Sequence, residues 1–597
     1  MDKEEITILQ VPQQDLEHCS FFKCKAADVD AWIATLPIAN LGQTTRQLYS
    51  VLEELNRVRL VPHTRMMVLE KLRRTVHYVS KALSKHYLNQ SIVLPKLPRK
   101  VADLASTLNL LFATGYKIVA AHAAALGSND KLISKALHRA VTDLTLVLQR
   151  HYQLYEPVSE ALWLSLHQYY IMARQNNLLS VNIQDDEFGN GTVEESYIKA
   201  LLLGCSKPNQ LRQEDFNNLY QALNDWAKYC RIMLAESDSI FMFNLMLDKP
   251  PVYSTLYDHS TDSEFCLEFD TTLLVEHLNE MWKESTNTSL IINRDQVITI
   301  SRDLLSHLML SWGSISKRNF MRIEVNDTLD LCVGLSATHY FVSNKMSLDA
   351  LIEENGTNIL GSREENPFLK TKSHVYRQKD VWDSPYESNF GKTQVSLESL
   401  DIQVRDDKVP SPEEASKYTR NNVPLINYSS QGYCVKWPEN LTAQLKAGEI
   451  IGIKDSKMQN WSIADIRWVN HENQGHTTIG LELISPNASP YGARVIRKKG
   501  DPGMYMRVFI LPEISVLNRP TTLLTPQVTF AEGQKVTLKQ GGQEVQVQLG
   551  KRLNSQAGYS LFELSKIGGD QLKKQQTTDD RADAVNDNEL ESIWKSL

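Results

Sequence analysis

Apolar residues recur with the period of an amphipathic helix through the first half of the chain. Leu48, Val51 and Leu55 show this spacing, and Thr64 is placed to cap the helix that follows. Further helices are expected around residues 133–155, 158–176, 193–204 and 213–236. The pattern therefore predicts an all-α N-terminal half, residues 1–300, built as an array of helix hairpins whose role the sequence does not indicate.

Alternation of apolar and polar residues replaces the helical period at about residue 300. Leu329, Leu331 and Val333 alternate with polar residues, and Ile479 and Leu481 repeat the pattern. Alternation of this kind is typical of half-buried strands. It predicts a β-rich domain over residues 301–498.

A long polar stretch, about residues 345–421, interrupts this β-rich domain. It is rich in Glu, Asp, Lys, Asn, Ser and Pro and has few apolar periods, so we interpret it as a largely flexible insertion. The strands that flank it are expected to end near Phe341 and to resume near Val423, and to pair with each other.

The last part of the chain carries a second, smaller set of strand signals. Val536 and Leu538 alternate, a Gly541-Gly542 pair offers a two-residue hairpin turn, and Val545 begins the return. This predicts a small β-rich unit over residues 499–567, followed by a polar tail at 568–597.

Composition limits the classes of function. The 597 residues carry a formal net charge of -7, which argues against binding of a nucleic-acid polymer, because such binding needs many cationic contacts to phosphates. The seven cysteines are scattered without a CxxC pair, which indicates a reducing compartment and no metal site.

The acidic start of the chain is unlike a secretory signal, and polar Asn109 and Lys117 within the most apolar stretch indicate a core helix rather than a transmembrane segment. A cytoplasmic protein is expected.

No short catalytic motif is found, and no catalytic residue is proposed. The segment Gly356–Arg363, GTNILGSR, lacks the lysine that a phosphate-binding loop needs. HExxH and GxGxxG are also absent. Because triads can assemble from distant residues, an enzyme with its site in the helical half stays open as an alternative.

Three cations stand immediately before the first alternating strand: Lys317, Arg318 and Arg322, in the sequence KRNFMR. Guanidinium groups suit a phosphodiester ligand, because their planar fork gives bidentate bonds and their flat face stacks on a purine. Taken alone, an RxxxR spacing is common on solvated helix faces.

A second element, Asn427 to Gly432 (NYSSQG), leads into the strand that carries Val435 and Trp437. Asn427 and Ser429 supply short hydrogen-bonding groups on a turn, and Gly432 lets the backbone approach a ligand closely. Taken alone, this element is an ordinary turn that enters a strand.

Together, RxxxR, a strand, [D/N]xSxxG and further strands resemble the PilZ domain of bacterial cyclic-di-GMP receptors. The later segments Ile466-Arg-Trp468 and Ile479-Gly-Leu-Glu-Leu483 follow in the family's order. One departure is the long insertion between the two motifs. The resemblance implies a six-stranded antiparallel barrel and no cofactor.

The resemblance also implies the ligand, cyclic-di-GMP, and a role for each motif residue. Arg318 and Arg322 would hold phosphates and guanines, Asn427 and Ser429 would hydrogen-bond a guanine edge, Gly432 would leave room for the base, and Lys317 would add charge. Ligand capture at the joint between the two halves would reorient them, and a protein partner would bind the helical half or the insertion. The alternative within the family is a PilZ-like scaffold that does not bind nucleotide.

Overall fold

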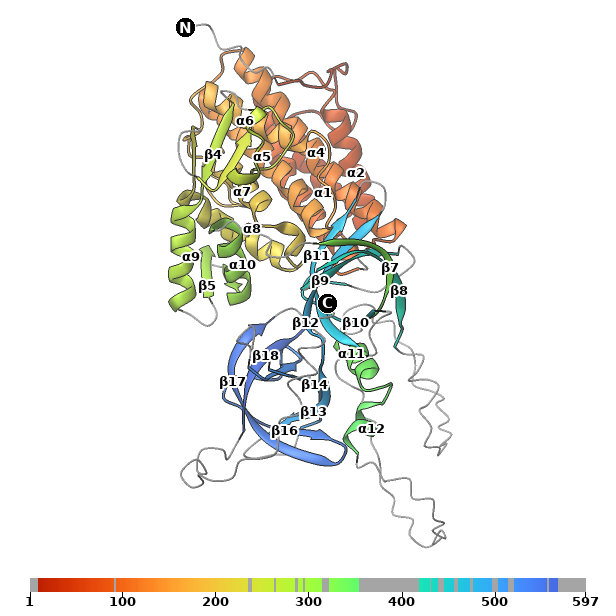
Figure 1. Ribbon diagram of the computed structural model, residues 1–597. Coiled ribbons are helices and arrows are strands. Elements are labelled where there is room, and N and C mark those ends of the chain that lie inside the picture. The colour runs from red at the N-terminus through yellow and green to blue at the C-terminus, as the bar shows by residue number, and fades with distance from the viewer. Residues whose placement is uncertain are drawn as a thin grey trace, which may run out of the picture.

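The computed structural model describes residues 9–90, 93–234, 239–261, 265–284, 288–293, 296–313, 322–353, 418–429, 431–438, 445–455, 460–472, 476–496, 503–513, 520–555 and 558–566. A helical domain is followed by a first β-barrel and then by a second, and the two barrels lie against each other (Figure 1). The helical N-terminal half and the multidomain organisation expected from the sequence are confirmed.

Long helices build the N-terminal domain. They are α1 Ala26–Thr35, α2 Leu41–Leu55, α3 Pro62–Leu83, α4 Lys96–Ala125, α5 Asp130–Gln153, α6 Leu162–Gln175, α7 Val193–Cys205 and α8 Asp215–Trp226, with short 3₁₀ turns η1 Ser84–His86, η2 Pro208–Gln210 and η3 Ala227–Tyr229. Proline occupies the first turn of α3, where its missing amide hydrogen costs nothing. A capping box formed by Thr192 and Glu195 starts α7.

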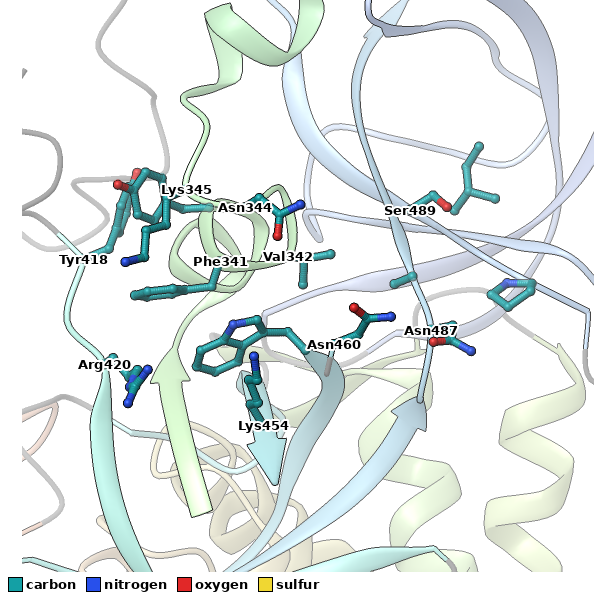
Figure 2. A pocket seen from close by; sticks show the side chains of 15 residues that line it. Phe341, Val342, Asn344, Lys345, Tyr418, Arg420, Lys454, Asn460, Asn487 and Ser489 are labelled. Atoms are coloured by element: carbon teal, nitrogen blue, oxygen red, sulfur yellow. The ribbon is translucent and has the colours of Figure 1, made fainter. Parts of the chain in front are cut away.

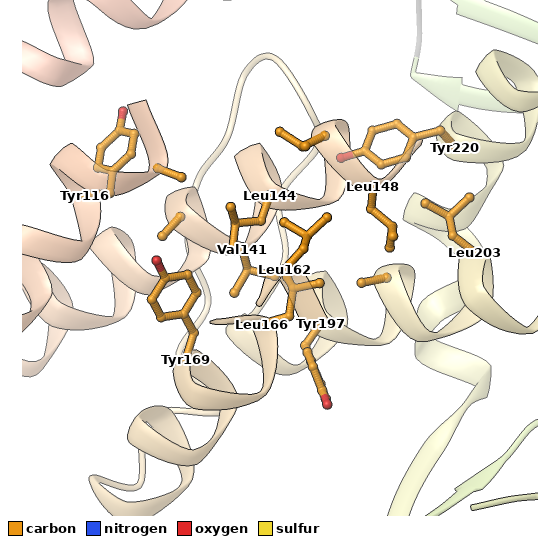
Figure 3. Packing of buried hydrophobic residues seen from close by; sticks show 14 of the residues in the cluster. Tyr116, Val141, Leu144, Leu148, Leu162, Leu166, Tyr169, Tyr197, Leu203 and Tyr220 are labelled. Carbon is orange, nitrogen blue, oxygen red and sulfur yellow. The ribbon is translucent and has the colours of Figure 1, made fainter. Parts of the chain in front are cut away.

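Helix α5 lies at the centre of this domain and is buried along nearly its whole length. Val141, Leu144 and Leu148 of α5 point toward Leu162 and Leu166 of α6 (Figure 3). Helix α4 is long and apolar enough to cross a membrane by length and composition, yet 56% of its most apolar window is buried inside the domain. It packs on α3 and α5 as a core helix, as the sequence predicts.

A small mixed region that the sequence pattern did not predict follows α8. Its strands β1 Arg231–Leu234, β2 Phe241–Asn244, β3 Val252–Tyr253 and β4 Cys266–Asp270 form one antiparallel sheet in the order β1-β4-β2-β3. The expected helix over 213–236 is therefore wrong beyond Trp226. The β2 and β4 side chains are buried on both faces, so these short strands show no alternation.

The rest of this region links the sheet to the first barrel. It comprises η4 Ser254–Leu256, η5 His259–Thr261, α9 Thr272–Glu284, β5 Thr288–Asn293, β6 Gln296–Ile300 and α10 Arg302–Gly313. The indole nitrogen of Trp312, on α10, donates a 3.1 Å hydrogen bond to the carbonyl of Leu202 on α7. Helix α10 is thus fixed to the helical domain just before the barrel begins.

The first barrel is closed and antiparallel, with strands in the order β10-β11-β12-β9-β8-β7. The strands are β7 Ile323–Val333, β8 Asn421–Ser429, β9 Gly432–Trp437, β10 Ile450–Asp455, β11 Ser462–His471 and β12 Thr477–Ser485. The six strands agree with the barrel that the resemblance implied. The insertion interrupts the sequence between β7 and β8, and these two strands pair as expected.

The strand before the insertion ends earlier than expected. β7 stops at Val333, because Gly334 has φ +90 and turns the chain into helix α11, Leu335–Val342. A further short helix, α12 Leu348–Ile352, lies on the second barrel, where the Leu351 carbonyl accepts a hydrogen bond from the amide of Gly541 at 2.8 Å. Residues 345–353 of the expected insertion are therefore folded, and 354–417 lie outside the described residues.

The second barrel is also closed and antiparallel, in the order β13-β14-β15-β18-β17-β16. Its strands are β13 Ser489–Val495, β14 Met506–Leu511, β15 Thr522–Thr525, β16 Lys535–Gln540, β17 Gln543–Ser555 and β18 Ser560–Lys566. The sequence located the hairpin between β16 and β17. Strand β13 pairs with β14 and β16 and so belongs to the second barrel. The boundary between the two barrels therefore lies before Ser489 rather than at residue 498. The polar tail at 568–597 lies outside the described residues.

Candidate ligand-binding site

The two sequence motifs converge on one edge of the first barrel. Arg322 immediately precedes β7, and its neighbour Ile323 is in register with Tyr428 of β8. One further step along this antiparallel ladder places Arg322 level with Ser429. Lys317 and Arg318 lie outside the described residues.

The NYSSQG element forms the hairpin between β8 and β9. Asn427 pairs with Glu324 of β7 on one side and with Cys434 of β9 on the other. Both ladders have a bulge next to Asn427, and bulges are a common way to redirect a side chain beside a site. The half-buried Asn427 is thus held at the hairpin beside Arg322.

The hydroxyl of Ser429 is held only weakly by the hairpin itself. It donates to the Gly432 carbonyl at 3.5 Å and accepts from the amide of Gln431 at 3.4 Å. Both distances lie beyond the usual range for strong hydrogen bonds. Ser429 can therefore exchange either contact for a better partner without a large loss.

Gly432 has a structural requirement that the motif alone did not reveal. A Cβ at this position would lie 2.0 Å from the carbonyl oxygen of Leu481 on the neighbouring strand β12. No side chain can be accommodated there unless the backbone moves. Glycine is thus needed to close the barrel between β9 and β12, whether or not a ligand is present.

Packing explains the pairing of Trp468 with Gly480 in the two later segments that resemble the PilZ family. Trp468 of β11 is in register with Gly480 of β12, and a Cβ on Gly480 would lie 2.1 Å from the indole nitrogen of Trp468. The glycine therefore leaves the space that the indole ring fills. On the same pair of strands, Arg467 forms a 2.9 Å ion pair with Glu482.

The motif side chains that are described remain available to a ligand. The structure gives neither the guanidinium of exposed Arg322 nor the amide of Asn427 a hydrogen bond or ion pair with another described residue. Burial raises the pKa of the Cys434 thiol, and the positive charge of Arg322 opposes this shift. Among the described residues, the hairpin thus brings together a guanidinium and an amide that have no partner and a hydroxyl that has only long hydrogen bonds.

Glu482 is a neighbour of the site that the sequence did not single out. It is in register with Gly432 across β12 and β9, and its carboxylate is tied to Arg467. In the sequence, Glu482 was noticed only as part of a strand-like segment, and such a position does not indicate a function.

The helical domain contains its own cluster of ionisable groups. Arg73 binds both carboxylate oxygens of Asp185, at 2.7 and 2.9 Å, and Arg139 adds a third contact at 2.6 Å. His77 lies between Asp143, at 2.8 Å, and Glu187, at 2.5 Å. Burial disfavours the charged carboxylate, but Arg73 and Arg139 hold the pKa of Asp185 well below its usual value.

These groups are paired with one another, and most are buried. Mutual pairing of buried charges is typical of a structural ion network that joins helices and a loop. It gives the alternative of an enzyme in the helical half no specific support.

Comparison with known families places the fold and the hairpin site in one class of protein. Family profiles match in chain order: the N-terminal domain of cyclic-di-GMP receptor FimW at residues 26–237, its middle PilZ domain at 240–490 and its C-terminal β-barrel domain at 491–567. The chain belongs to this PilZ-containing receptor family, and the resemblance drawn from the two motifs is confirmed.

Among individual proteins, the cyclic-di-GMP receptor FimW of Pseudomonas aeruginosa is 33% identical over 611 aligned positions. The alignment covers 99% of this chain and 98% of that protein. No solved structure matches the chain.

Proposed function

We propose that this chain is a receptor that binds cyclic-di-GMP at the β8–β9 hairpin and relays the signal between its domains, rather than a catalyst. The observation that carries the proposal is the strand register that sets Arg322 level with Ser429, beside Asn427. Apart from the structure, the proposal is supported by the chain's membership of a family that is named for receptors of cyclic-di-GMP.

The ligand chemistry fits these side chains. Arg318 and Arg322 hold the phosphates and the guanine acceptor edge, because a guanidinium fork makes bidentate, charge-assisted bonds. Asn427 and Ser429 bond the other edge of a guanine, and Lys317 adds charge. Gly432 leaves room for the base, and it also avoids a Cβ that would lie 2.0 Å from the carbonyl oxygen of Leu481.

The relay acts through the segment that joins α10 to β7. Trp312 anchors α10 in the helical domain, whereas Arg322 belongs to the barrel, so a ligand held by Arg318 and Arg322 bridges this joint. Ordering backbone residues costs about 1 to 2 kcal/mol each, which the ligand's contacts must exceed. Binding and domain arrangement are then coupled, and a protein partner reads the change through the helical half or the insertion.

Titration with cyclic-di-GMP tests the site. Replacing Arg318 or Arg322 by Ala is expected to weaken binding by roughly a hundredfold, since each charge-assisted bond contributes about 1.5 to 3 kcal/mol. Arg322→Lys is expected to restore little, because lysine lacks the fork. Arg231→Ala, an exposed arginine on β1, is the matched control and is expected to leave the isotherm unchanged.

Two outcomes decide between this proposal and the alternatives. Equal isotherms for wild type, Arg318→Ala and Arg322→Ala would overturn the site, and absence of binding would favour a scaffold. Hydrogen exchange and small-angle scattering test the relay, with Arg318→Ala as the control. Tight binding without added protection over residues 310–325 and without a change of shape would contradict it.

A further inference from the structure

A groove of about 1070 Å³ lies where the two barrels meet, away from the hairpin site. One wall comes from α11 and from residues 418–461 of the first barrel, and the other from residues 487–512, at the start of the second barrel. Figure 2 shows Phe341, Lys345, Arg420 and Lys454 on one side and Asn487 and Ser489 on the other. Its volume is at the upper end for small-molecule and cofactor sites.

The groove is cationic in a chain whose net charge is -7. Lys345, Arg420 and Lys454 line it, and the described lining residues include no Asp or Glu. Behind this wall, Asp330 forms a 3.2 Å ion pair with Arg420 and also accepts a hydrogen bond from Asn422. Within the described part of the chain, Lys345 and Lys454 have no carboxylate partner.

The groove also holds a fixed aromatic plane. The half-buried ring of Trp461 packs on the buried ring of Phe341, with centroids 5.0 Å apart and planes inclined by 31°. A ring supported in this way loses little freedom when a planar ligand stacks on its exposed face. Amide side chains of Asn344, Asn460 and Asn487 surround it and can bond to a polar ring edge.

Lys345 occupies its place at a conformational cost. It follows the end of helix α11 at Val342 by three residues and has φ 66, directly after Asn344 with φ 56, and its amide donates to the Tyr340 carbonyl at 2.8 Å. A lysine with positive φ is strained because its Cβ crowds the backbone, whereas glycine adopts this conformation freely. The exposed side chain of Lys345 lines the groove, where its amine can contact a bound anion.

From these observations we propose that the groove between the barrels is a second ligand site, and that it takes a nucleotide. Lys345, Lys454 and Arg420 bind its phosphates, and the base stacks on Trp461. The groove shares no lining residue with the hairpin motifs, so it is a separate site from the one at Arg322 and Asn427.

Calorimetric titrations with GDP and with inorganic pyrophosphate test this proposal on the full chain. Both probes are expected to bind, and GDP more tightly, because only GDP has a ring to stack. Lys345→Gly and Lys454→Ala are each expected to weaken both probes by about tenfold, the effect of losing one charge-assisted contact. Lys535→Ala, an exposed lysine on β16 outside the groove, is the matched control.

Two further variants separate binding from folding. Trp461→Leu keeps apolar packing on Phe341 but removes the indole plane, so it is expected to weaken GDP and to leave pyrophosphate unchanged. Lys345→Gly is expected to raise the unfolding temperature while it weakens binding, because glycine relieves the backbone strain. A lysine retained only for structure would not show this combination.

The outcomes also separate this site from the hairpin site. GDP binding that persists in Arg322→Ala protein supports an independent groove, whereas its loss there would assign GDP to the hairpin and overturn the proposal. No GDP binding up to about millimolar concentration, or equal binding by both lysine variants and the wild type, would also overturn it. Binding of a hexaglutamate peptide without GDP binding would show that the groove takes an acidic peptide instead.

Discussion

The amide of His471 donates a 3.0 Å hydrogen bond to the carbonyl of Tyr155, and so joins β11 of the first barrel to the end of helix α5. The Tyr155 ring belongs to the hydrophobic core of the barrel rather than to that of the helical domain. Its hydroxyl donates to the Leu211 carbonyl at 2.8 Å. One residue of the helical domain thus completes the core of the ligand-binding barrel.

Replacing Tyr155 by Ala is expected to destabilise the barrel by about 3 to 5 kcal/mol, because it leaves a cavity of aromatic size. Tyr155→Phe keeps the ring and is expected to cost only about 1 to 3 kcal/mol, for the unpaired Leu211 carbonyl. Urea unfolding followed by tryptophan fluorescence measures both. Similar losses for the two variants would show that the ring does not fill the barrel core.

Gly432 and Ser429 belong to one motif but are expected to behave differently. Gly432→Ala forces a Cβ onto the Leu481 carbonyl, so it is expected to lower the unfolding temperature of the barrel even without ligand. Ser429→Ala removes only two long hydrogen bonds and is expected to leave that temperature nearly unchanged while it weakens cyclic-di-GMP binding. Thermal unfolding without ligand, with titration alongside, separates the two roles. A Gly432→Ala protein as stable as the wild type would contradict the close approach.

The free energy of unfolding is expected to fall as pH rises, because a buried carboxyl group at the contact between the barrels resists ionisation. The hydroxyl of Tyr559, in the second barrel, donates to buried Asp465 at 3.0 Å, and the other oxygen of Asp465 has no partner among described residues. Burial, and then the charge of Glu482, raise the pKa of Asp465 from 3.8 to about 6. The folded state therefore retains a proton that the unfolded chain releases, so stability falls between about pH 4 and pH 6 and stays lower above that.

Asp465→Asn tests this pH dependence, because asparagine is uncharged and can still accept from Tyr559. At pH 8 the variant is expected to be more stable than the wild type by about 2 to 3 kcal/mol, given about 1.4 kcal/mol per pKa unit. The difference is expected to vanish near pH 4. Urea unfolding of both proteins across this range measures it, and parallel profiles would contradict the buried, protonated carboxyl group.

The ion network of the helical domain is expected to be sensitive to the loss of one partner. Arg73→Ala removes two of the three arginine contacts to fully buried Asp185, which is expected to cost about 3 to 5 kcal/mol. Arg174→Ala, at an exposed position in the last turn of α6, is the control and is expected to stay within about 0.5 kcal/mol of the wild type. Equal stability of the two variants would show that Arg139 alone is sufficient.

The sequence predicted β7, β12, β16 and β17, because apolar and polar residues alternate along them, but it did not locate β10, β13, β14, β15 or β18. It missed β2 and β4, whose side chains are buried on both faces, and it placed the end of β7 near Phe341, although the chain turns at Gly334 into α11. Periodicity reports which faces are buried, not where the backbone changes direction.

The candidate binding motif was visible in the sequence because Arg322, Asn427 and Ser429 lie in short fixed patterns. The groove between the barrels was not, because Lys345, Lys454 and Trp461 come from separate elements and only the fold brings them together. The reason for Gly432 was hidden in the same way, since Leu481 lies on another strand.

Both barrels are closed, and closure limits how other proteins can bind them. Every strand of each barrel has a neighbour on both sides, so neither barrel offers a free edge to which a partner could add a strand. For the same reason, the barrels offer no free strand edge for strand exchange between copies of the chain or for edge-to-edge aggregation. Within the described residues, free sheet edges are confined to the short outer strands β1 and β3 and to the β5–β6 hairpin, so a partner must recognise the barrels through side chains and loops.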